Sequence, residues 1–177
     1  MPCISLPRDL LFAELGRSYT EDEFQELCFE FGIELDEVTV EKLVNTAKRG
    51  VEASEEEVVM FKIEMPANRY DLLCLEGLAA ALNCFVGRAQ PPTFALAPLP
   101  AGGPLLMTVK PETAQIRPYI VCAVLRDISL STAAYTSLIE LQDRMHHNIC
   151  RRRTLVAIGT HDLDKLQPPF TYEARLP

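Results

Sequence analysis

The stretch that most constrains the fold is GRAQPPTFALAPLPAGGP, residues 87–104, which contains five prolines and three glycines. Proline lacks the backbone N–H that helices and central strands need, so this stretch cannot continue either kind of element. We therefore predict a first domain over residues 1–88, a Pro/Gly-rich linker over 89–104, and a second domain over 105–177.

Charge divides the chain at nearly the same place. Residues 1–90 hold 8 Lys and Arg against 18 Asp and Glu, a net charge of −10, whereas residues 91–177 hold 9 against 7, a net charge of +2. Because phosphates bind Lys and Arg surfaces, a nucleic acid would meet the second half. The acidic first half lacks the basic face that DNA binding requires, so we predict no DNA partner.

Composition indicates a globular protein of a reducing compartment. No apolar run reaches the ~18–20 residues that span a bilayer, and the N-terminus lacks the basic and apolar segments of a secretory signal, so we expect a cytoplasmic protein without a membrane partner. The six cysteines include no CxxC pair and mostly have apolar neighbours. This usage is typical of buried thiols and predicts neither a metal site nor a disulfide framework.

The first half alternates between helix and strand patterns. A capping-box pair, Thr20 and Glu23, precedes apolar residues at helical spacing. We expect helices over 7–15 and 21–31, a loop over 34–57, a strand over 58–65, and a helix whose apolar face carries Leu72, Leu75, Leu78, Ala79 and Leu82.

In the second half we expect strands at about 105–109, at 119–128 and at 154–159, and a helix over 131–149. The overall fold class is therefore α+β: a small helical N-terminal domain with a short sheet, followed by the start of a mixed α/β domain.

A polar quartet, Asn-Arg-Tyr-Asp at 68–71, lies between the predicted strand and the following helix. In the structural interpretation, Asn68 or Asp71 caps the helix while Arg69 pairs with a carboxylate. In the functional interpretation, Arg69 binds a phosphate or carboxylate of a partner. The acidic surroundings favour the structural motif.

The helix over 131–149 places Gln142 and His146 one turn apart within an apolar stripe. Buried polar side chains need partners, so the pair either reads a polar group of a ligand or lies at the edge of the core. The run Arg151–Arg153 is typical of a solvated helix end, and could also hold an RNA backbone.

No catalytic motif is complete in this chain. GxSxG, HExxH, a Walker loop and GxGxxG are all absent. His161 and Asp162 are adjacent on extended chain, so their side chains point in different directions and form no dyad.

Four blocks resemble the N-terminal portion of the β subunit of phenylalanyl-tRNA synthetases of the archaeal and eukaryotic cytosolic type. They are RDLLFAELGRSYTEDEFQELCFEFGIELDE, PANRYDLLCLEGLA, IRPYIVCAVLRDI, and LIELQDRMHHNICRRRTLVAIGTHDLDKL followed by PPFTY. Only residues 39–57 and 86–108 carry no resemblance.

The resemblance implies a second domain that begins an editing domain, which hydrolyses tRNA mischarged with tyrosine. It implies an α2β2 heterotetramer with the synthetase α subunit and a tRNA(Phe) substrate. It also implies ATP and Mg²⁺ as cofactors of the full enzyme, and neither cofactor is expected to bind this chain. Gln142 and Arg153 correspond to editing-pocket residues of the family, and helix geometry adds His146. The chain alone is expected to be inactive. The alternative is a stand-alone module that binds a protein through an acidic helical face.

Overall fold

The computed structural model describes residues 2–44, 55–100 and 102–175, which form two compact units. The first unit comprises residues 1–92 and 131–157, and the second comprises 93–130 and 158–177. The helix after the linker is thus grouped with the N-terminal residues. The predicted division at 89–104 stays a prediction.

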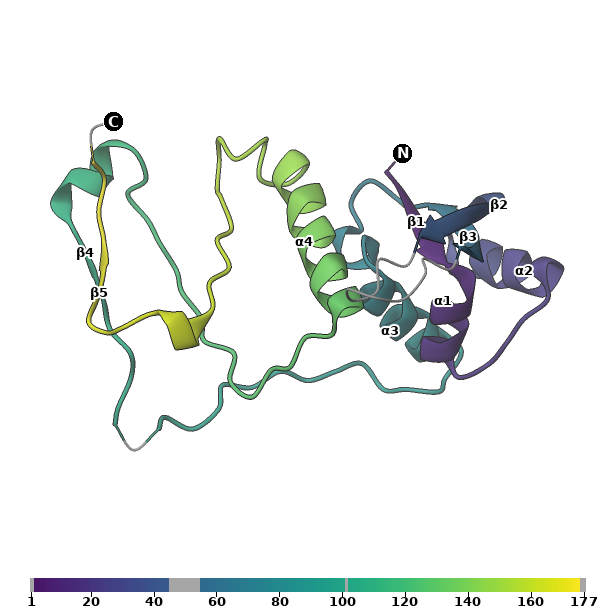
Figure 1. The fold of residues 1–177 in the computed structure, drawn as a ribbon, viewed down its shortest axis with the longest axis horizontal. Coiled ribbons are helices and arrows are strands. Elements are labelled where there is room, and N and C mark those ends of the chain that lie inside the picture. The colour runs from purple at the N-terminus through teal and green to yellow at the C-terminus, as the bar shows by residue number, and fades with distance from the viewer. Residues whose placement is uncertain (1, 45–54, 101, 176–177) are drawn as a thin grey trace. The chain divides into compact units, whose positions relative to one another are not determined.

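The first unit is built on an antiparallel sheet of three strands in the order β1-β3-β2 (Figure 1). Strand β1 spans Cys3–Pro7, β2 spans Glu34–Val44, and β3 spans Glu55–Glu64. Alternation along β1 and β3 buries Ile4, Leu6, Phe61 and Ile63 and leaves Cys3 exposed. The sheet therefore has one buried face, as a period of two requires.

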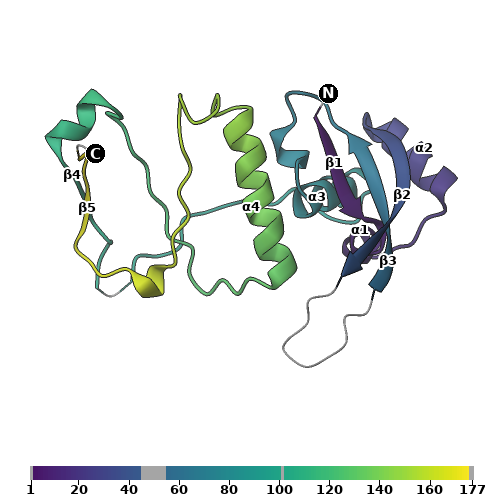
Figure 2. The same cartoon turned by 45° about the horizontal axis from the view of Figure 1, so that its top comes forward.

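Three helices complete this unit: α1 over Arg8–Leu15, α2 over Glu21–Phe31 and α3 over Leu75–Phe85. Figure 2 shows them beside the sheet, and contacts join α1 to α3 and β3, and α2 to β2. The predicted helices over 7–15 and 21–31 are confirmed, and the capping box of Thr20 is present. Gly16 ends α1 with a φ of 64°, in the left-handed region that favours glycine.

Aromatic rings form the centre of the core between the sheet and these helices. Phe24 and Phe61 stack with centroids 5.0 Å apart, and Phe12 meets both rings edge-on at 5.6 and 5.7 Å. Offset and edge-to-face geometries are those that aromatic quadrupoles prefer. Phe61 lies within the strand predicted over 58–65, which forms most of β3.

The predicted loop over 34–57 is wrong for 34–44 and for 55–57, which belong to β2 and β3. The charged side chains that suggested a loop lie on a strand that pairs with β3 from Glu34 to Val44. Lys62 of β3 forms ion pairs with Asp36 at 3.2 Å and Glu37 at 3.3 Å, so cross-strand pairing compensates their charge. The rest of the predicted loop, 45–54, lies outside the described residues.

Helix α4 spans Thr132–His147, and Ser131 caps it by accepting a hydrogen bond from the Ala134 N–H at 3.1 Å. Two contacts join it to the α3 region: Arg144 donates to the Leu73 carbonyl at 2.5 Å, and the Ser137 hydroxyl donates to Glu76 at 2.6 Å. These contacts explain why α4 groups with the N-terminal residues.

The second unit contains a parallel pair of short strands, β4 over Met107–Val109 and β5 over Phe170–Tyr172. The strands predicted at 119–128 and 154–159 are wrong, because neither segment pairs with a strand in the described part of the chain. Val121 is 96% exposed and Leu155 is 60% exposed. Apolar character predicts a strand only where a neighbouring strand satisfies its backbone.

The fold class is α+β, as the sequence predicts. None of the helices in the described ranges has the length and apolar character needed to cross a membrane.

Candidate functional site

The Asn-Arg-Tyr-Asp quartet forms a tight ionic pair within itself. Arg69 Nε lies 2.9 Å from Asp71 Oδ1, and Arg69 Nη2 lies 2.8 Å from Asp71 Oδ2. This bidentate contact holds the pKa of the Asp71 carboxyl below its usual value and raises that of Arg69. The guanidinium also lies 5.6 Å from the centroid of the Phe31 ring on α2.

The predicted cap of α3 by Asn68 or Asp71 is wrong. A 3-10 turn over Tyr70–Leu72 begins within the quartet and includes its Tyr70 and Asp71, so α3 begins only at Leu75. Its cap is Cys74, whose Sγ accepts a hydrogen bond from the Gly77 N–H at 3.4 Å. The abrupt change from strand to helix is therefore bridged by an extra turn, and the quartet fixes that turn.

The first turn of α3 lies against the carbonyl of Asp71. A Cβ placed on Gly77 would come within 1.9 Å of the Asp71 carbonyl oxygen. Only glycine permits this approach. Gly77 is thus a structural determinant of the junction that the sequence patterns did not single out.

The three predicted editing-pocket residues lie at the C-terminal end of α4 and in the turn that follows. His146 is buried, with 3% of its surface exposed, and Arg153 Nε donates to its Nδ1 at 3.2 Å. Gln142 is half-buried one helical turn before His146. The structure therefore joins His146 to Arg153 directly and places Gln142 on the preceding turn.

Asp143 is a fourth member of this cluster that the sequence did not predict. Its carboxylate lies 3.9 Å from Arg153 Nη2 and 3.4 Å from His147 Nδ1. The contact to His147 has the i,i+4 spacing of a helix, which would have been the available signal. Asp143 is adjacent in sequence to Gln142, so the cluster combines an amide, a carboxylate, an imidazole and a guanidinium.

The three arginines do not extend the helix, so their interpretation as a helix end is wrong. Helix α4 ends at His147, and Arg151, Arg152 and Arg153 have φ values of 48°, 54° and 64°. We call these three residues the arginine turn. The Thr154 N–H and hydroxyl both donate to the Arg151 carbonyl, at 3.1 and 2.6 Å, and close it.

His161 and Asp162 lie in the second unit. Asp162 accepts a hydrogen bond from the Asp164 N–H at 3.1 Å and begins a 3-10 turn over Leu163–Lys165. The described residues contain no group of three His, Cys, Asp or Glu side chains arranged to hold a metal ion. The structure thus assigns Asp162 a local capping contact.

Comparison with a solved structure identifies the class of protein to which this fold corresponds. The chain superposes with a TM-score of 0.76 and 28% identity on the crystal structure of an N-terminal fragment of the phenylalanyl-tRNA synthetase β-subunit from Pyrococcus horikoshii. The match covers 97% of this chain and 45% of that one. The fold is thus that of an aminoacyl-tRNA synthetase subunit fragment.

Sequence comparison identifies the family. Residues 1–88 match the model of the Phe-tRNA synthetase beta subunit B1 domain. The whole chain is 58% identical to the cytoplasmic phenylalanine–tRNA ligase beta subunit of Arabidopsis thaliana and 53% identical to the human beta subunit. The chain belongs to the phenylalanyl-tRNA synthetase β-subunit family, as its N-terminal portion, and spans 30% of the length of these relatives.

Proposed function

We propose that this chain is the N-terminal part of a β subunit that takes part in charging tRNA(Phe) with phenylalanine and in hydrolysing Tyr-tRNA(Phe). The observation that carries the proposal is the 58% identity to a phenylalanine–tRNA ligase beta subunit over the full length of this chain. Its partners would be the synthetase α subunit, in an α2β2 heterotetramer, and tRNA(Phe). It would act in the cytoplasm.

Within this chain, the editing role rests on the cluster at the end of α4. Gln142 would donate and accept hydrogen bonds, and the Arg153 guanidinium would supply positive charge to the misacylated tyrosine or the tRNA end. Water would be the nucleophile. Residues 93–130 and 158–177, the second unit, would form the start of the editing domain.

ATP and Mg²⁺ would serve the complete enzyme. The 177-residue chain alone should neither charge nor deacylate tRNA.

The test uses a complete β subunit that contains this sequence, co-expressed with its α subunit. The assembly should charge tRNA(Phe) with phenylalanine in the presence of ATP and Mg²⁺ and should release tyrosine from Tyr-tRNA(Phe). The isolated chain at equal concentration serves as the control. Charging without deacylation would remove the editing role and leave the synthetase assignment.

A second candidate function is a stand-alone protein-interaction module that uses an acidic helical face. It is favoured by α2, where Phe29 is 84% exposed on a helix that carries exposed Glu26 and Glu30. An apolar ring among carboxylates suits a basic partner. The test compares the wild type with Phe29→Ala in a complete β subunit. If the variant still assembles with the α subunit and the assembly still charges tRNA, the result would favour the synthetase role.

A further inference from the structure

The arginine turn is a strained backbone feature held in place by specific contacts. Three consecutive non-glycine residues adopt positive φ angles between 48° and 64°. Left-handed conformation costs L-residues roughly 1–2 kcal/mol each, and such strain persists only where surrounding contacts enforce it. A conformation this costly, at a run of three arginines, calls for a functional explanation.

The contacts that enforce the turn lie on both sides of it. Before it, the Arg151 N–H donates to the Asn148 carbonyl at 3.0 Å, and the Asn148 side chain donates to the Arg144 carbonyl at 2.9 Å. After it, the Leu155 N–H donates to the carbonyl of buried Cys150 at 3.2 Å. The turn is therefore fixed to the end of α4 by backbone and side-chain hydrogen bonds.

Arg153 is the anchor of the turn. Its guanidinium donates to His146 Nδ1, which must be unprotonated to accept, and it also lies near Asp143. The buried imidazole thus acts on the turn by holding Arg153.

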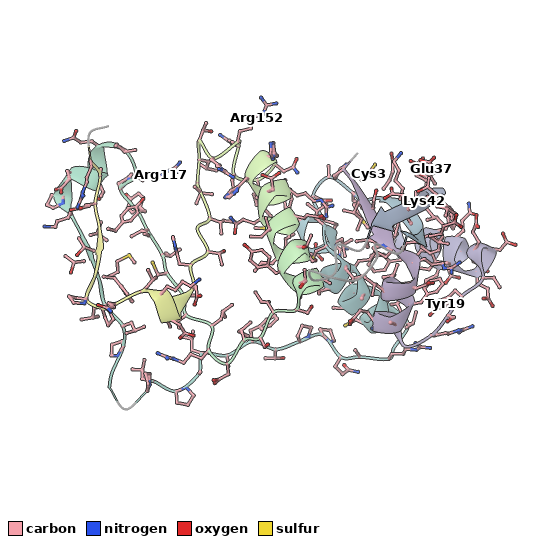
Figure 3. The ribbon with its side chains drawn as sticks, viewed as in Figure 1. Cys3, Tyr19, Glu37, Lys42, Arg117 and Arg152 are labelled. Carbon is pink, nitrogen blue, oxygen red and sulfur yellow. The ribbon has the colours of Figure 1, made fainter. Side chains whose placement is uncertain are left out.

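Arg151 and Arg152 remain directed toward solvent. Both are exposed, and Figure 3 shows the Arg152 side chain pointing away from the ribbon. Within the ranges that the structure describes, no ion pair is recorded for either side chain. Two uncompensated guanidinium groups on a rigid turn are well suited to bind phosphates, which they contact through two parallel N–H···O bonds.

We propose that the arginine turn is a preformed binding site for the phosphate backbone of single-stranded RNA, contacted by Arg151 and Arg152 and held in position by Arg153 on His146. The identity of the RNA as the tRNA substrate rests on the proposed function. The net charge of −10 over residues 1–90 disfavours a polyanion there, whereas the arginine turn lies in the half of the sequence that has a net charge of +2. Two phosphate contacts predict a salt dependence of slope about −1.4, at about 0.7 per contact for a single strand.

The first experiment measures binding of the full 177-residue chain to a fluorescein-labelled 12-nucleotide single-stranded RNA by anisotropy, from about 20 to 150 mM salt. The double variant Arg151→Ala/Arg152→Ala should weaken binding about tenfold at the lowest salt and remove most of the slope. The control, Arg126→Ala/Arg175→Ala, changes net charge equally at two other exposed arginines and should leave binding within about twofold. Equal weakening by both pairs, or no binding by the wild type, would overturn the proposal.

The anchor is tested with two substitutions of His146. His146→Asn places a side-chain oxygen acceptor near the position of Nδ1, so this variant should retain RNA binding. His146→Leu removes the acceptor and should weaken RNA binding several-fold. Arg153→Ala should reproduce the effect of His146→Leu. Circular dichroism identifies any variant that fails to fold, and in that case Arg153→Lys, which keeps the positive charge but lacks the Nε donor to His146, decides the question by weakening RNA binding as His146→Leu is expected to do.

A phosphorylated peptide is the other polyanion with this chemistry. A doubly phosphorylated peptide of matched length is titrated in parallel, and tighter binding of that peptide than of the RNA would overturn the choice of RNA. The failure of this proposal is distinct from failure of the proposed function. RNA binding that depends on Arg151 and Arg152, in a synthetase that does not deacylate Tyr-tRNA(Phe), would retain the site and remove the editing role.

Discussion

Replacing Gly77 by alanine should destabilise the first unit by about 3 kcal/mol. The new Cβ would lie 1.9 Å from the Asp71 carbonyl oxygen and 3.2 Å from Cys74 Sγ. A carbon and an oxygen normally approach to about 3.3 Å, so the turn and α3 must separate by roughly 1.4 Å. Overpacking that moves backbone costs about 1–3 kcal/mol, and separation also disrupts the Cys74 cap. The higher helix propensity of alanine offsets about 1 kcal/mol.

Urea unfolding followed by circular dichroism at 222 nm measures this cost, because the four α-helices of the described residues all lie in the first unit. With a slope near 2 kcal/mol/M, the midpoint should fall by about 1.5 M. Gly102→Ala is the matched control, since its Cβ would meet no atom within 4 Å, and its effect should stay within about 0.5 kcal/mol. A Gly77→Ala variant as stable as the wild type would refute the close approach described here.

Three further substitutions test local contacts by the same urea assay. Thr20→Ala removes the hydroxyl that accepts from the Glu23 N–H and should cost about 1 kcal/mol, and a loss below about 0.2 kcal/mol would exclude the cap. Burial raises the pKa of the Cys28 thiol from 9.0 to about 12, so the unfolded chain ionises first and stability should fall as pH rises from 9 toward 12. Cys28→Ala should show a shallower alkaline decline, with the remainder due in part to Cys74, whose pKa burial also raises, and an unchanged decline would contradict the burial argument. Arg69 lowers the pKa of Asp71 in the folded chain below its value in the unfolded chain. The stability that this pair contributes is therefore present above the Asp71 pKa of the unfolded chain and is lost as the pH falls through the Asp71 pKa of the folded chain. Asp71→Asn should cost about 0.5 kcal/mol at pH 7, because the pair is solvent-screened, and should flatten the acid limb; an unchanged acid limb would count against the pair.

The sequence predicted best where one local signal decided the structure. The capping box at Thr20 and the helical spacing that follows it placed α2, and the strand pattern over 58–65 placed β3. Each of these signals acts within a few residues and needs no distant partner.

The errors occurred where distant residues decide. The charged residues of β2 resembled a loop, and they form a strand because β3 pairs with them. The segments at 119–128 and 154–159 resembled strands and remain unpaired with any strand among the described residues. Strand formation depends on a neighbour, which apolar pattern alone does not supply.

The candidate site was predicted in part. Helical spacing identified Gln142 and His146 as one face of α4, and the family resemblance added Arg153. The contact between Arg153 and His146 depends on the left-handed turn between them, and nothing in a run of arginines signals positive φ. The contact of Asp143 with Arg153 also depends on that turn, so only the i,i+4 spacing to His147 could have identified Asp143 from the sequence.

The measurement that tests the central claim most directly is Tyr-tRNA(Phe) hydrolysis by the complete synthetase, as wild type, Gln142→Ala and Arg153→Ala. Both variants should release tyrosine more slowly than the wild type while charging tRNA(Phe) with phenylalanine at an unchanged rate. Hydrolysis that both substitutions leave unchanged would contradict the assignment of the α4 cluster to the editing pocket. A wild-type assembly that neither charges nor deacylates would contradict the functional account as a whole.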